Sequence, residues 1–152
     1  MAGKVNASAQ VSIRKFCIEE YEDLMKLWRG SKLPHKPAGR DSKESITREI
    51  EQMNAVFLVA EKDGELIGSA FGTHDGRKGW INRVAVTPRH RRQGIAERLV
   101  SEVERQLGYM GILIIACLIE DWNTESMEFF EKIGYKRHRD IYYYTKREDP
   151  EI

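Results

Sequence analysis

The sequence predicts a single domain of mixed α/β class (α+β), with a central, mostly antiparallel sheet flanked by helices in the order β-α-α-β-β-β-α-β-α-β(β). Three observations predict it. Amphipathic helical patterns are interspersed with β-type runs, Asp63-Gly64 separates two of those runs, and the apolar run Ile112–Ile119 follows the helical pattern Gly94–Leu107. That last order favours a right-handed parallel crossover beside an antiparallel meander. The 152 residues are the length of one domain.

The N-terminal part begins with a small, polar segment, Met1–Gln10, which we expect to be disordered. Val11–Ile18 alternates apolar and polar residues and predicts a strand. Glu19–Arg29 carries apolar residues at helical spacing, and Gly30 supplies a stop signal. The domain proper is therefore expected to start at residue 11.

A loop and a short helix follow. Ser31–Arg40 holds two prolines and a glycine, which is typical of a loop. After it, Ser42 is a candidate N-cap for a second helix. Ile46, Ile50 and Met53 recur at helical spacing and are expected on its inner face.

The middle of the chain predicts three antiparallel strands. Ala55–Glu61 and Glu65–Gly72 flank Asp63-Gly64, a dipeptide that supplies the positive φ angles of a two-residue hairpin turn. A polar turn over His74–Gly79 then leads into a third strand, Trp80–Val86.

The next unit is a loop, a helix and a strand. Thr87–Arg92 precedes a helix over Gly94–Leu107, where Ile95, Leu99 and Val103 form one apolar stripe. Ile112–Ile119 is apolar throughout, which predicts a strand buried on both faces.

The C-terminal part contains a last helix, Asn123–Ile133, with Asn123 as candidate N-cap and Gly134 just past its end. Lys136–Lys146 predicts one or two closing strands, so the domain is expected to span residues 11–147. Residues 148–152 are charged and expected to be loose.

Composition excludes several classes of protein. The net charge is +1, which gives no overall field toward nucleic acid or membranes. No apolar run approaches the roughly 20 residues of a membrane helix, and no secretory signal is visible, so we expect a cytoplasmic protein. Cys17 and Cys117 lie far apart in apolar runs and read as reduced core thiols. No cysteine and histidine set has metal-ligand spacing, so no metal is expected.

Arg91–Ala96 carries the chemistry. It lies between a strand and an amphipathic helix, and a helix start leaves backbone N–H groups unpaired and carries partial positive charge. Gly94 and the small Ala96 let a ligand approach that backbone, and Arg91 and Arg92 add charge. The pattern predicts an anion site, typically for a diphosphate; a solvated basic turn ended by glycine is the alternative that spacing alone leaves open.

Two motifs resemble those of the GNAT acetyltransferase superfamily. Arg91–Ala96 is similar to its Arg/Gln-x-x-Gly-x-Gly/Ala motif and follows a strand that ends in Val84–Val86. Asn123–Tyr135, with its aromatic pair, Glu131-Lys132 and Gly134-Tyr135, resembles the family's later helix. The resemblance covers at least Ala55–Tyr135. It is nearest to small, stand-alone bacterial members, including those similar to ribosomal-protein alanine N-acetyltransferases.

The resemblance implies an enzyme that transfers an acetyl group from acetyl-coenzyme A to a primary amine of a small molecule or a peptide N-terminus, by direct attack in a ternary complex. Backbone groups of Val84, Ala85 and Val86 would bind the pantetheine arm, one of their N–H groups would polarise the thioester, and Asn123 and Phe130 would lie near the arm and the sulfur. The diphosphate would lie on the backbone and side chains of Arg91, Arg92, Gln93, Gly94, Ile95, Ala96 and Glu97.

The chain departs from the family pattern at the acid and the base. The second aromatic residue of the pair is usually a tyrosine that protonates the departing thiolate, and here it is Phe130. Solvent, Tyr142 and Tyr144 are the candidate substitutes. The usual base positions hold Asn82 and Leu118, so Glu120 and Asp121 are the nearest candidates for a base acting through water, although Asp121 also suits helix capping.

Two other readings stay open. The missing tyrosine is also compatible with a non-catalytic acyl-coenzyme A sensor or partner module. The basic cluster Arg77–Arg92 is compatible with a nucleic-acid surface, against which the net charge argues. The acceptor cannot be read from the sequence, and exposed sheet edges leave a homodimer open.

Overall fold

The computed structural model describes residues 10–152, so most of the predicted N-terminal tail lies outside the described residues. Its centre is a five-stranded sheet in the order β1-β2-β3-β4-β5. The strands are β1 (Ser12–Lys15), β2 (Ala55–Lys62), β3 (Glu65–His74), β4 (Lys78–Val86) and β5 (Ile114–Ala116). The first four pair antiparallel, and β5 pairs parallel to β4. The predicted mixed, mostly antiparallel sheet is confirmed.

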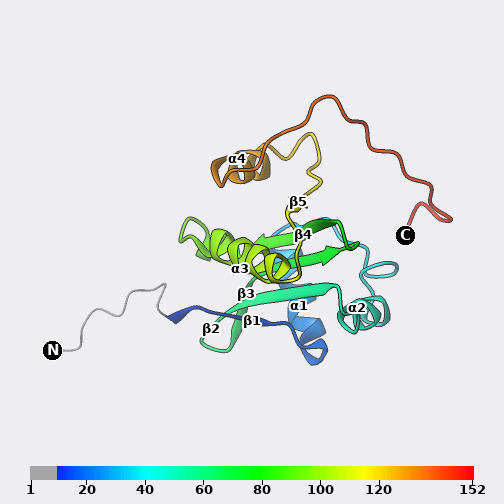
Figure 1. The fold of residues 1–152 in the computed structure, drawn as a ribbon. Coiled ribbons are helices and arrows are strands. Elements are labelled where there is room, and N and C mark those ends of the chain that lie inside the picture. The colour runs from blue at the N-terminus through cyan, green and yellow to red at the C-terminus, as the bar shows by residue number, and fades with distance from the viewer. Residues whose placement is uncertain (1–9) are drawn as a thin grey trace.

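Helices cover both faces of this sheet (Figure 1). On one face lie α1 (Tyr21–Gly30), which follows the short 3-10 helix Ile18–Glu20, and α2 (Lys43–Ile50). On the other lies α3 (Ile95–Tyr109), which follows a second 3-10 turn, Pro88–His90. The two faces bury separate clusters, because alternate residues of a strand point to opposite sides. In β2, Val56 and Leu58 pack toward α3, whereas Phe57 and Val59 pack toward α1 and α2.

The predicted hairpin between β2 and β3 is confirmed. Asp63 and Gly64 both have positive φ, at 51° and 78°, the pair of angles that a type I′ turn needs. The turn lets β2 and β3 pair over nearly their whole length, from Ala55 opposite Thr73 to Lys62 opposite Glu65.

Strand β4 contains a bulge that changes its direction. Ser69 pairs with Ala85 and Phe71 with Asn82, so two residues of β4, Arg83 and Val84, oppose one residue of β3. Arg83 adopts a left-handed conformation with φ 55°, which is uncommon for a residue with a side chain. A bulge of this kind bends a strand and redirects its side chains.

The last helix, α4 (Thr124–Lys132), begins at Asn123, whose Oδ1 accepts a hydrogen bond from the backbone N–H of Ser126 at 3.2 Å. The predicted N-cap is therefore confirmed. Phe130 is buried and joins the cluster beneath α3, which ties α4 to the body of the protein.

Two strand predictions in the C-terminal part are wrong. Ile112–Ile119 is not a strand buried on both faces: only Ile114–Ala116 pairs, at the sheet edge, and Leu113, Ile114 and Leu118 are exposed. Lys136–Lys146 forms no strand, because a strand needs a neighbour for its backbone groups and this segment runs away from the sheet (Figure 1). Both segments are rich in residues that favour strands, but outside Ile114–Ala116 they have no neighbouring strand to pair with in the described part of the chain.

Two smaller expectations also fail. Helix α2 ends at Ile50, so Met53 lies in the following turn with its side chain exposed instead of on an inner helix face. Cys17 is exposed beside the start of the first 3-10 helix and is not a core thiol. In both cases the residue continues the sequence pattern of its neighbours but lies just outside the strand or helix that they form.

Candidate active-site cleft

Only part of the β4 edge that faces β5 is hydrogen-bonded to a neighbouring strand. Strand β5 pairs with Lys78–Trp80 and then ends at Ala116. From Ile81 to Val86 that edge of β4 therefore has no strand partner among residues 10–152. Backbone N–H and C=O groups of an unpaired edge can bind an extended ligand in place of a strand. Of these groups, the Val86 carbonyl already accepts from Arg91 Nε and Ser31 Oγ.

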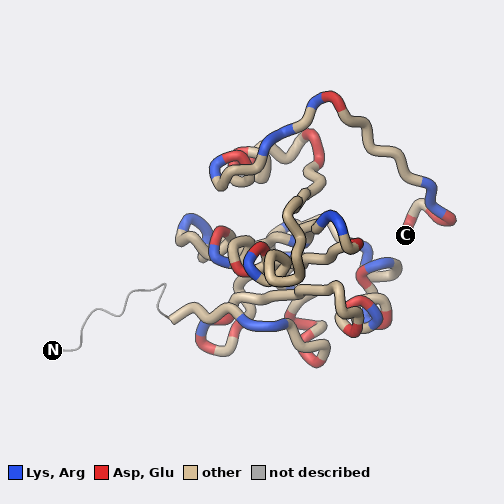
Figure 2. The backbone as a smooth tube through the Cα atoms, viewed as in Figure 1, with Lys and Arg blue, Asp and Glu red and all other residues tan. Residues whose placement is uncertain are grey.

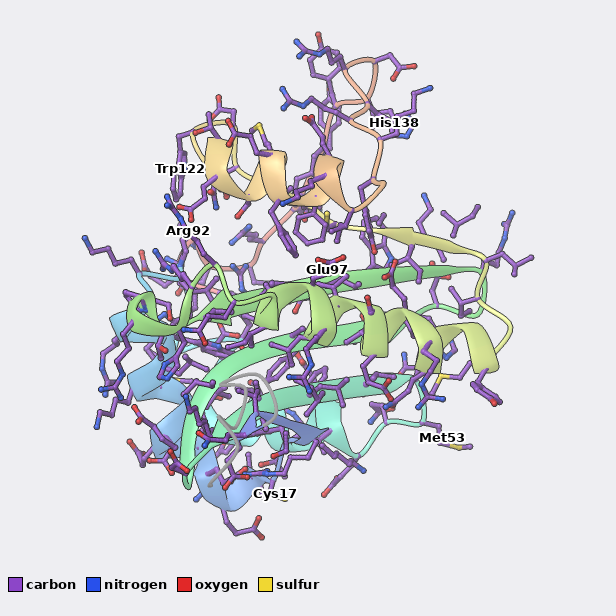
Figure 3. The ribbon with its side chains drawn as sticks, turned by 90° about the vertical axis from the view of Figure 1, so that its left-hand side faces the viewer. Cys17, Met53, Arg92, Glu97, Trp122 and His138 are labelled. Carbon is purple, nitrogen blue, oxygen red and sulfur yellow. The ribbon has the colours of Figure 1, made fainter. Side chains whose placement is uncertain are left out.

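The start of α3 follows this edge after a short connection that contains the 3-10 turn Pro88–His90. Gly94 is the N-cap, with φ 75°, and no side chain caps the helix. A Cβ placed on Gly94 would contact nothing within 4 Å, so the space in front of the backbone is open. Unpaired N–H groups with an open approach make an anion site. Arg92, also at positive φ, and the exposed Glu97 flank the helix start, below Trp122 (Figure 3).

The other predicted residues of this motif have different roles. Ile95 is buried in the core, so only its backbone can face a ligand, and Ala96 is half-buried. Arg91 donates from Nε to the carbonyl of Val86 at 3.2 Å, which links the motif to the end of β4. Gln93 is exposed at the turn.

A cleft of about 450 Å³ opens beside the free edge of β4. Val84, Asn123, Phe130 and Glu120 lie together on its wall. Asp121, Tyr142 and the segment from Arg91 to Glu97 are not on that wall. The structure therefore brings one predicted base and three predicted ligand contacts together and leaves the predicted acid Tyr142 outside, with Tyr143 on the wall instead.

Phe130 has aromatic neighbours on two sides. Its ring centroid lies 5.0 Å from that of Phe129 and 5.0 Å from that of Tyr135, both in edge-to-face geometry. The Tyr135 hydroxyl donates to Glu104 Oε2 at 3.1 Å, and burial raises the pKa of Tyr135 above its usual range. This hydroxyl is engaged with α3, and Tyr135 is not on the cleft wall. It does not replace the acid that Phe130 lacks.

The opposite side of the cleft contains an ion pair between the buried Asp41 and the partly buried Arg83. Arg83 donates from Nη2 and Nε to Asp41 Oδ1, at 2.6 and 3.0 Å. The other carboxylate oxygen accepts from the backbone N–H of Lys36 at 2.7 Å, and the Tyr21 hydroxyl donates to the Asp41 carbonyl at 2.7 Å. The Arg83 guanidinium also lies over the Trp28 ring, 5.7 Å from its centroid. These contacts hold the loop before α2 against the bulge of β4.

Glu49, on α2, is a second carboxylate on this side of the wall. Desolvation raises its pKa above the usual value, the nearby Arg83 charge lowers it, and the Asp41 charge raises it. Its carboxylate makes no hydrogen bond or ion pair within the part of the chain that the structure describes. An unpaired carboxylate in a cleft can bind an ammonium group or accept a proton from it.

Sequence reasoning missed this half of the site. Asp41 and Arg83 are far apart in sequence and only the bulge brings them together. Glu49 sits on a helix of ordinary amphipathic pattern, so no local signal marks it. Trp122, Tyr143 and Arg147 also line the cleft and were not predicted as site residues.

Over residues 10–152, no group of three or more His, Cys, Asp or Glu side chains has an arrangement that could hold a metal ion. Within the same range, none of the helices is long and apolar enough to span a membrane.

Known proteins share this architecture. PaiA N-acetyltransferase of Thermoplasma acidophilum, crystallised with coenzyme A, superposes with a TM-score of 0.72 at 24% identity, over 83% of this chain and 89% of that one. The aminoglycoside acetyltransferase AAC(6′)-Iy, in complex with a bisubstrate analogue, gives 0.75 at 21% identity, over 90% and 98%. A soil-metagenome aminoglycoside acetyltransferase in complex with sisomicin gives 0.73 at 15% identity, over 93% and 100%. At these identities the likeness shows the fold.

Sequence comparison identifies the family. The model of the acetyltransferase (GNAT) family matches residues 20–135, which is most of the chain. An acetyltransferase of Photorhabdus laumondii subsp. laumondii is 30% identical over 138 residues, 90% of this chain and 95% of that protein. The predicted resemblance is confirmed: this chain belongs to the GNAT family and is an N-acetyltransferase.

Proposed function

We propose that the chain binds acetyl-coenzyme A along the free edge of β4 and transfers its acetyl group to a primary amine of a small molecule or a peptide N-terminus. The observation that carries the proposal is the unpaired stretch Ile81–Val86, followed after the short connection 87–93 by a helix start at Gly94 that no side chain caps. An extended amide-containing arm followed by a diphosphate matches that sequence of sites.

The two ends of the cofactor have separate sites in this proposal. The backbone of Val84, Ala85 and Val86 binds the pantetheine arm, and the N–H groups from Gln93 to Glu97 bind the diphosphate, with Arg91 and Arg92 at the rim. Asn123 faces the arm from the other wall, since it lines the same cleft as Val84. Its Oδ1 already accepts from Ser126, so its amide N–H₂ is the group left for the ligand.

The chemical step needs no covalent enzyme intermediate. The neutral amine attacks the thioester carbonyl, a C–N bond forms, the tetrahedral intermediate collapses, and the C–S bond breaks to release the coenzyme A thiolate. A backbone N–H at the bulge of β4 stabilises the oxyanion, which is the largest electrostatic contribution expected in such a site. Positioning of amine and thioester in one cleft supplies most of the remaining acceleration.

The two proton transfers, to the departing thiolate and from the attacking amine, do not use the tyrosine and glutamate that are usual in the family. Phe130 has no proton to give, but a thiol with a pKa of about 8.5 is already a fair leaving group near neutral pH. Solvent, or Tyr143 on the cleft wall, protonates the thiolate. In this proposal Glu49 or Glu120, which both line the cleft, receives the proton of the attacking amine, directly or through water.

Relatives support a small-molecule amine as acceptor. Two of the superposed structures are described as complexes with an acetylneamine-containing bisubstrate analogue and with sisomicin. Both proteins are aminoglycoside acetyltransferases. A cleft of about 450 Å³ with carboxylates on its wall is compatible with an amine ligand of moderate size.

The test is an acceptor panel. Release of free thiol from acetyl-coenzyme A is followed with aminoglycosides, polyamines, amino acids and short peptides, and acetylated products are identified by mass spectrometry. Acetylation of at least one primary amine, abolished by heat denaturation of the protein, supports the proposal. Calorimetric binding of acetyl-coenzyme A without thiol release across the panel would favour the alternative, a non-catalytic acyl-coenzyme A module.

A further inference from the structure

One side of α4 forms part of the cleft wall. Asn123, Ser126 and Phe130 all line the cleft, and their spacing of three and four residues places them on the same side of the helix. Asn123 caps the helix, and the Phe130 ring packs against those of Phe129 and Tyr135. The folded structure therefore uses the side chains of Asn123 and Phe130, and the role of the Ser126 side chain is left to explain.

The Ser126 hydroxyl has no hydrogen-bond partner among residues 10–152. The start of α4 does not need it, because Ser126 donates its backbone N–H to Asn123 Oδ1 at 3.2 Å and Asn123 donates its own backbone N–H to the Glu120 carbonyl at 2.9 Å. Ser126 is half-buried, and within the described chain every fully buried side-chain oxygen or nitrogen has a partner. Ser126 Oγ is therefore accessible, and it can donate to a ligand in the cleft.

The position of Ser126 relative to Phe130 gives this hydroxyl a defined reach. Long side chains in a helix point back toward its N-terminus, so the tip of an aromatic side chain at position 130 lies over the preceding turn. Ser126 is in that turn, and the Cβ atoms of residues four apart are about 5–6 Å from each other. The Ser126 hydroxyl and a hydroxyl on the ring at position 130 would therefore reach the same part of the cleft.

A thiolate released in this part of the cleft would be close to several negative charges. Residues 120–132 contain five acidic residues and one lysine, and Figure 2 shows acidic positions on α4 and on its lead-in. Glu120 lines the cleft itself, as does Glu49. Nearby charges of the same sign disfavour the ionised form of a group, so a thiolate formed here needs a hydrogen-bond donor to offset them.

The arginines of the cleft wall are directed at other groups. Arg83 donates to Asp41 from both Nε and Nη2. Arg147 Nη1 donates to the Ile152 carbonyl at 2.7 Å, and Arg40 Nε lies 4.0 Å from Asp41 Oδ2. A neutral donor is therefore the remaining kind of group on the wall that can stabilise a thiolate.

Ser126, Tyr143 and Cys117 are the hydroxyl and thiol groups on the described cleft wall. The Tyr143 side chain is 68% exposed, so water competes for its hydroxyl. Burial raises the pKa of Cys117 to about 11, and a thiol is a weak hydrogen-bond donor. Ser126 combines an O–H donor with a position one turn before Phe130, which makes it the best placed of the three.

We propose that the Ser126 hydroxyl donates a hydrogen bond to the sulfur of coenzyme A as the thiolate leaves, and so substitutes for the hydroxyl that Phe130 lacks. The assignment rests on the proposed function, because it needs coenzyme A in the cleft. When the C–S bond of the tetrahedral intermediate breaks, its electron pair stays on sulfur. Ser126 stabilises this charge and keeps its own proton. Water then protonates the thiolate, and the proton lost by the amine leaves through a carboxylate or water.

The first test needs no acceptor amine. The pKa of the thiol of bound coenzyme A is measured from the ultraviolet absorbance of the thiolate as the pH rises, after subtraction of the protein alone. Ser126→Ala should raise this pKa by about one unit, a tenfold change in the ionisation constant, because a hydrogen bond to an ionised acceptor is a strong one. Ser126→Thr keeps a hydroxyl and should restore the original pKa.

The matched control is Thr124→Ala. It removes a hydroxyl from the same turn of α4, but Thr124 is exposed and lies outside the cleft wall, so the pKa of the bound thiol should not change. Circular dichroism and thermal unfolding verify that each variant is folded.

The second test is kinetic and uses an amine from the acceptor panel. Ser126→Ala should lower kcat and kcat/KM equally, by about tenfold, because the hydrogen bond strengthens only as charge develops on sulfur. Phe130→Tyr introduces a second hydroxyl over the same turn. In that background Ser126→Ala should lower kcat by less than about threefold, since two groups that do the same task are not additive.

Three results would overturn the assignment to Ser126. They are a bound thiol with the same pKa in Ser126→Ala and in the unmodified protein, an equal loss of kcat in the two backgrounds, and loss of coenzyme A binding in Ser126→Ala, which would make Ser126 a binding residue only. All three leave the proposed function in place. Failure of the unmodified protein to bind coenzyme A is a separate result, which would remove the proposed function and the assignment together.

Discussion

Arg83 binds Asp41 across 42 residues of sequence: both its Nε and its Nη2 donate to the same carboxylate oxygen. Arg83 reaches Asp41 from a bulge in β4, in a left-handed backbone conformation that costs of order 1–3 kcal/mol. The ion pair, the bulge and the loop before α2 therefore depend on one another, and this arrangement shapes the half of the cleft opposite the proposed cofactor site.

Breaking this ion pair should destabilise the protein strongly. Asp41→Asn removes the carboxylate that Arg83, whose side chain is 18% exposed, binds by two hydrogen bonds, and we expect a loss of about 3–5 kcal/mol in the free energy of unfolding. Chemical denaturation measures it. The control is Glu65→Gln, which breaks the exposed Arg89–Glu65 pair and should cost about 0–1 kcal/mol. Equal losses in the two variants would contradict the account of the buried pair.

Replacing Gly94 should lower both the stability of the protein and its affinity for acetyl-coenzyme A. Its φ of 75° is unfavourable for a residue with a Cβ, so Gly94→Ala should cost about 1–2 kcal/mol in stability. The added methyl group should also raise the KM for acetyl-coenzyme A by about tenfold, since it stands in front of the N–H groups proposed to bind the diphosphate.

Gly108→Ala is the matched control on the same helix. Its Cβ would also meet nothing within 4 Å, but its φ is not positive. It should stabilise α3 by about 0.5–1 kcal/mol and leave the KM unchanged. If Gly94→Ala lowers stability while leaving the KM for acetyl-coenzyme A as it was, the diphosphate does not lie there.

Glu49 should contribute to activity at a cost in stability. Desolvation raises the pKa of the folded-state carboxyl above the ordinary 4.5. The folded state therefore holds this proton more tightly than the unfolded state, and the ionised group opposes folding above its folded-state pKa. Glu49→Gln should stabilise the protein at neutral pH, and that advantage should shrink as the pH falls through the folded-state pKa toward 4.5.

The same substitution should lower kcat/KM for amine acceptors by about tenfold or more, because it removes a carboxylate that accepts the ammonium group or its proton. Denaturation as a function of pH and steady-state kinetics test the two effects. Glu51→Gln, an exposed residue at the C-cap of the same helix and outside the cleft wall, is the control and should change neither. A Glu49→Gln enzyme with unaltered kcat/KM would remove Glu49 from the site.

Cys117 should react slowly with alkylating reagents. Burial raises its pKa to about 11, so at a given pH near 8 it is far less ionised than an ordinary cysteine with a pKa of about 8.5. Alkylation by iodoacetamide should therefore be on the order of a hundredfold slower than for an ordinary thiol. The exposed Cys17 provides a comparison within the chain, and peptide mass spectrometry separates the two sites. Labelling of both at one rate would contradict the buried position of Cys117.

The sequence was sufficient where a local pattern determines the structure. Asp63 and Gly64 are sufficient to predict the turn between β2 and β3. Gly94, which precedes an amphipathic run, predicts both the start of a helix and a backbone that a ligand can approach. Such features depend on a few neighbouring residues, so they can be read without knowing the rest of the fold. The proposed cofactor half of the site rests on features of this kind.

The proposed acceptor half of the cleft could not be predicted in this way. Asp41, Glu49 and Arg83 come together only through a bulge and through packing of α2 on the sheet, and neither leaves a local signal. The predicted strand over Lys136–Lys146 failed for a related reason: alternation of side chains shows that a segment can pair but not which strand is available to it.

The most direct test of the account is a crystal structure of the protein with coenzyme A. We predict that the pantetheine arm lies along Ile81–Val86 and hydrogen-bonds to the β4 backbone, and that diphosphate oxygens lie within about 3.2 Å of backbone nitrogens between Gln93 and Glu97. Coenzyme A bound elsewhere, with the β4 edge and the start of α3 still empty, would contradict the central claim.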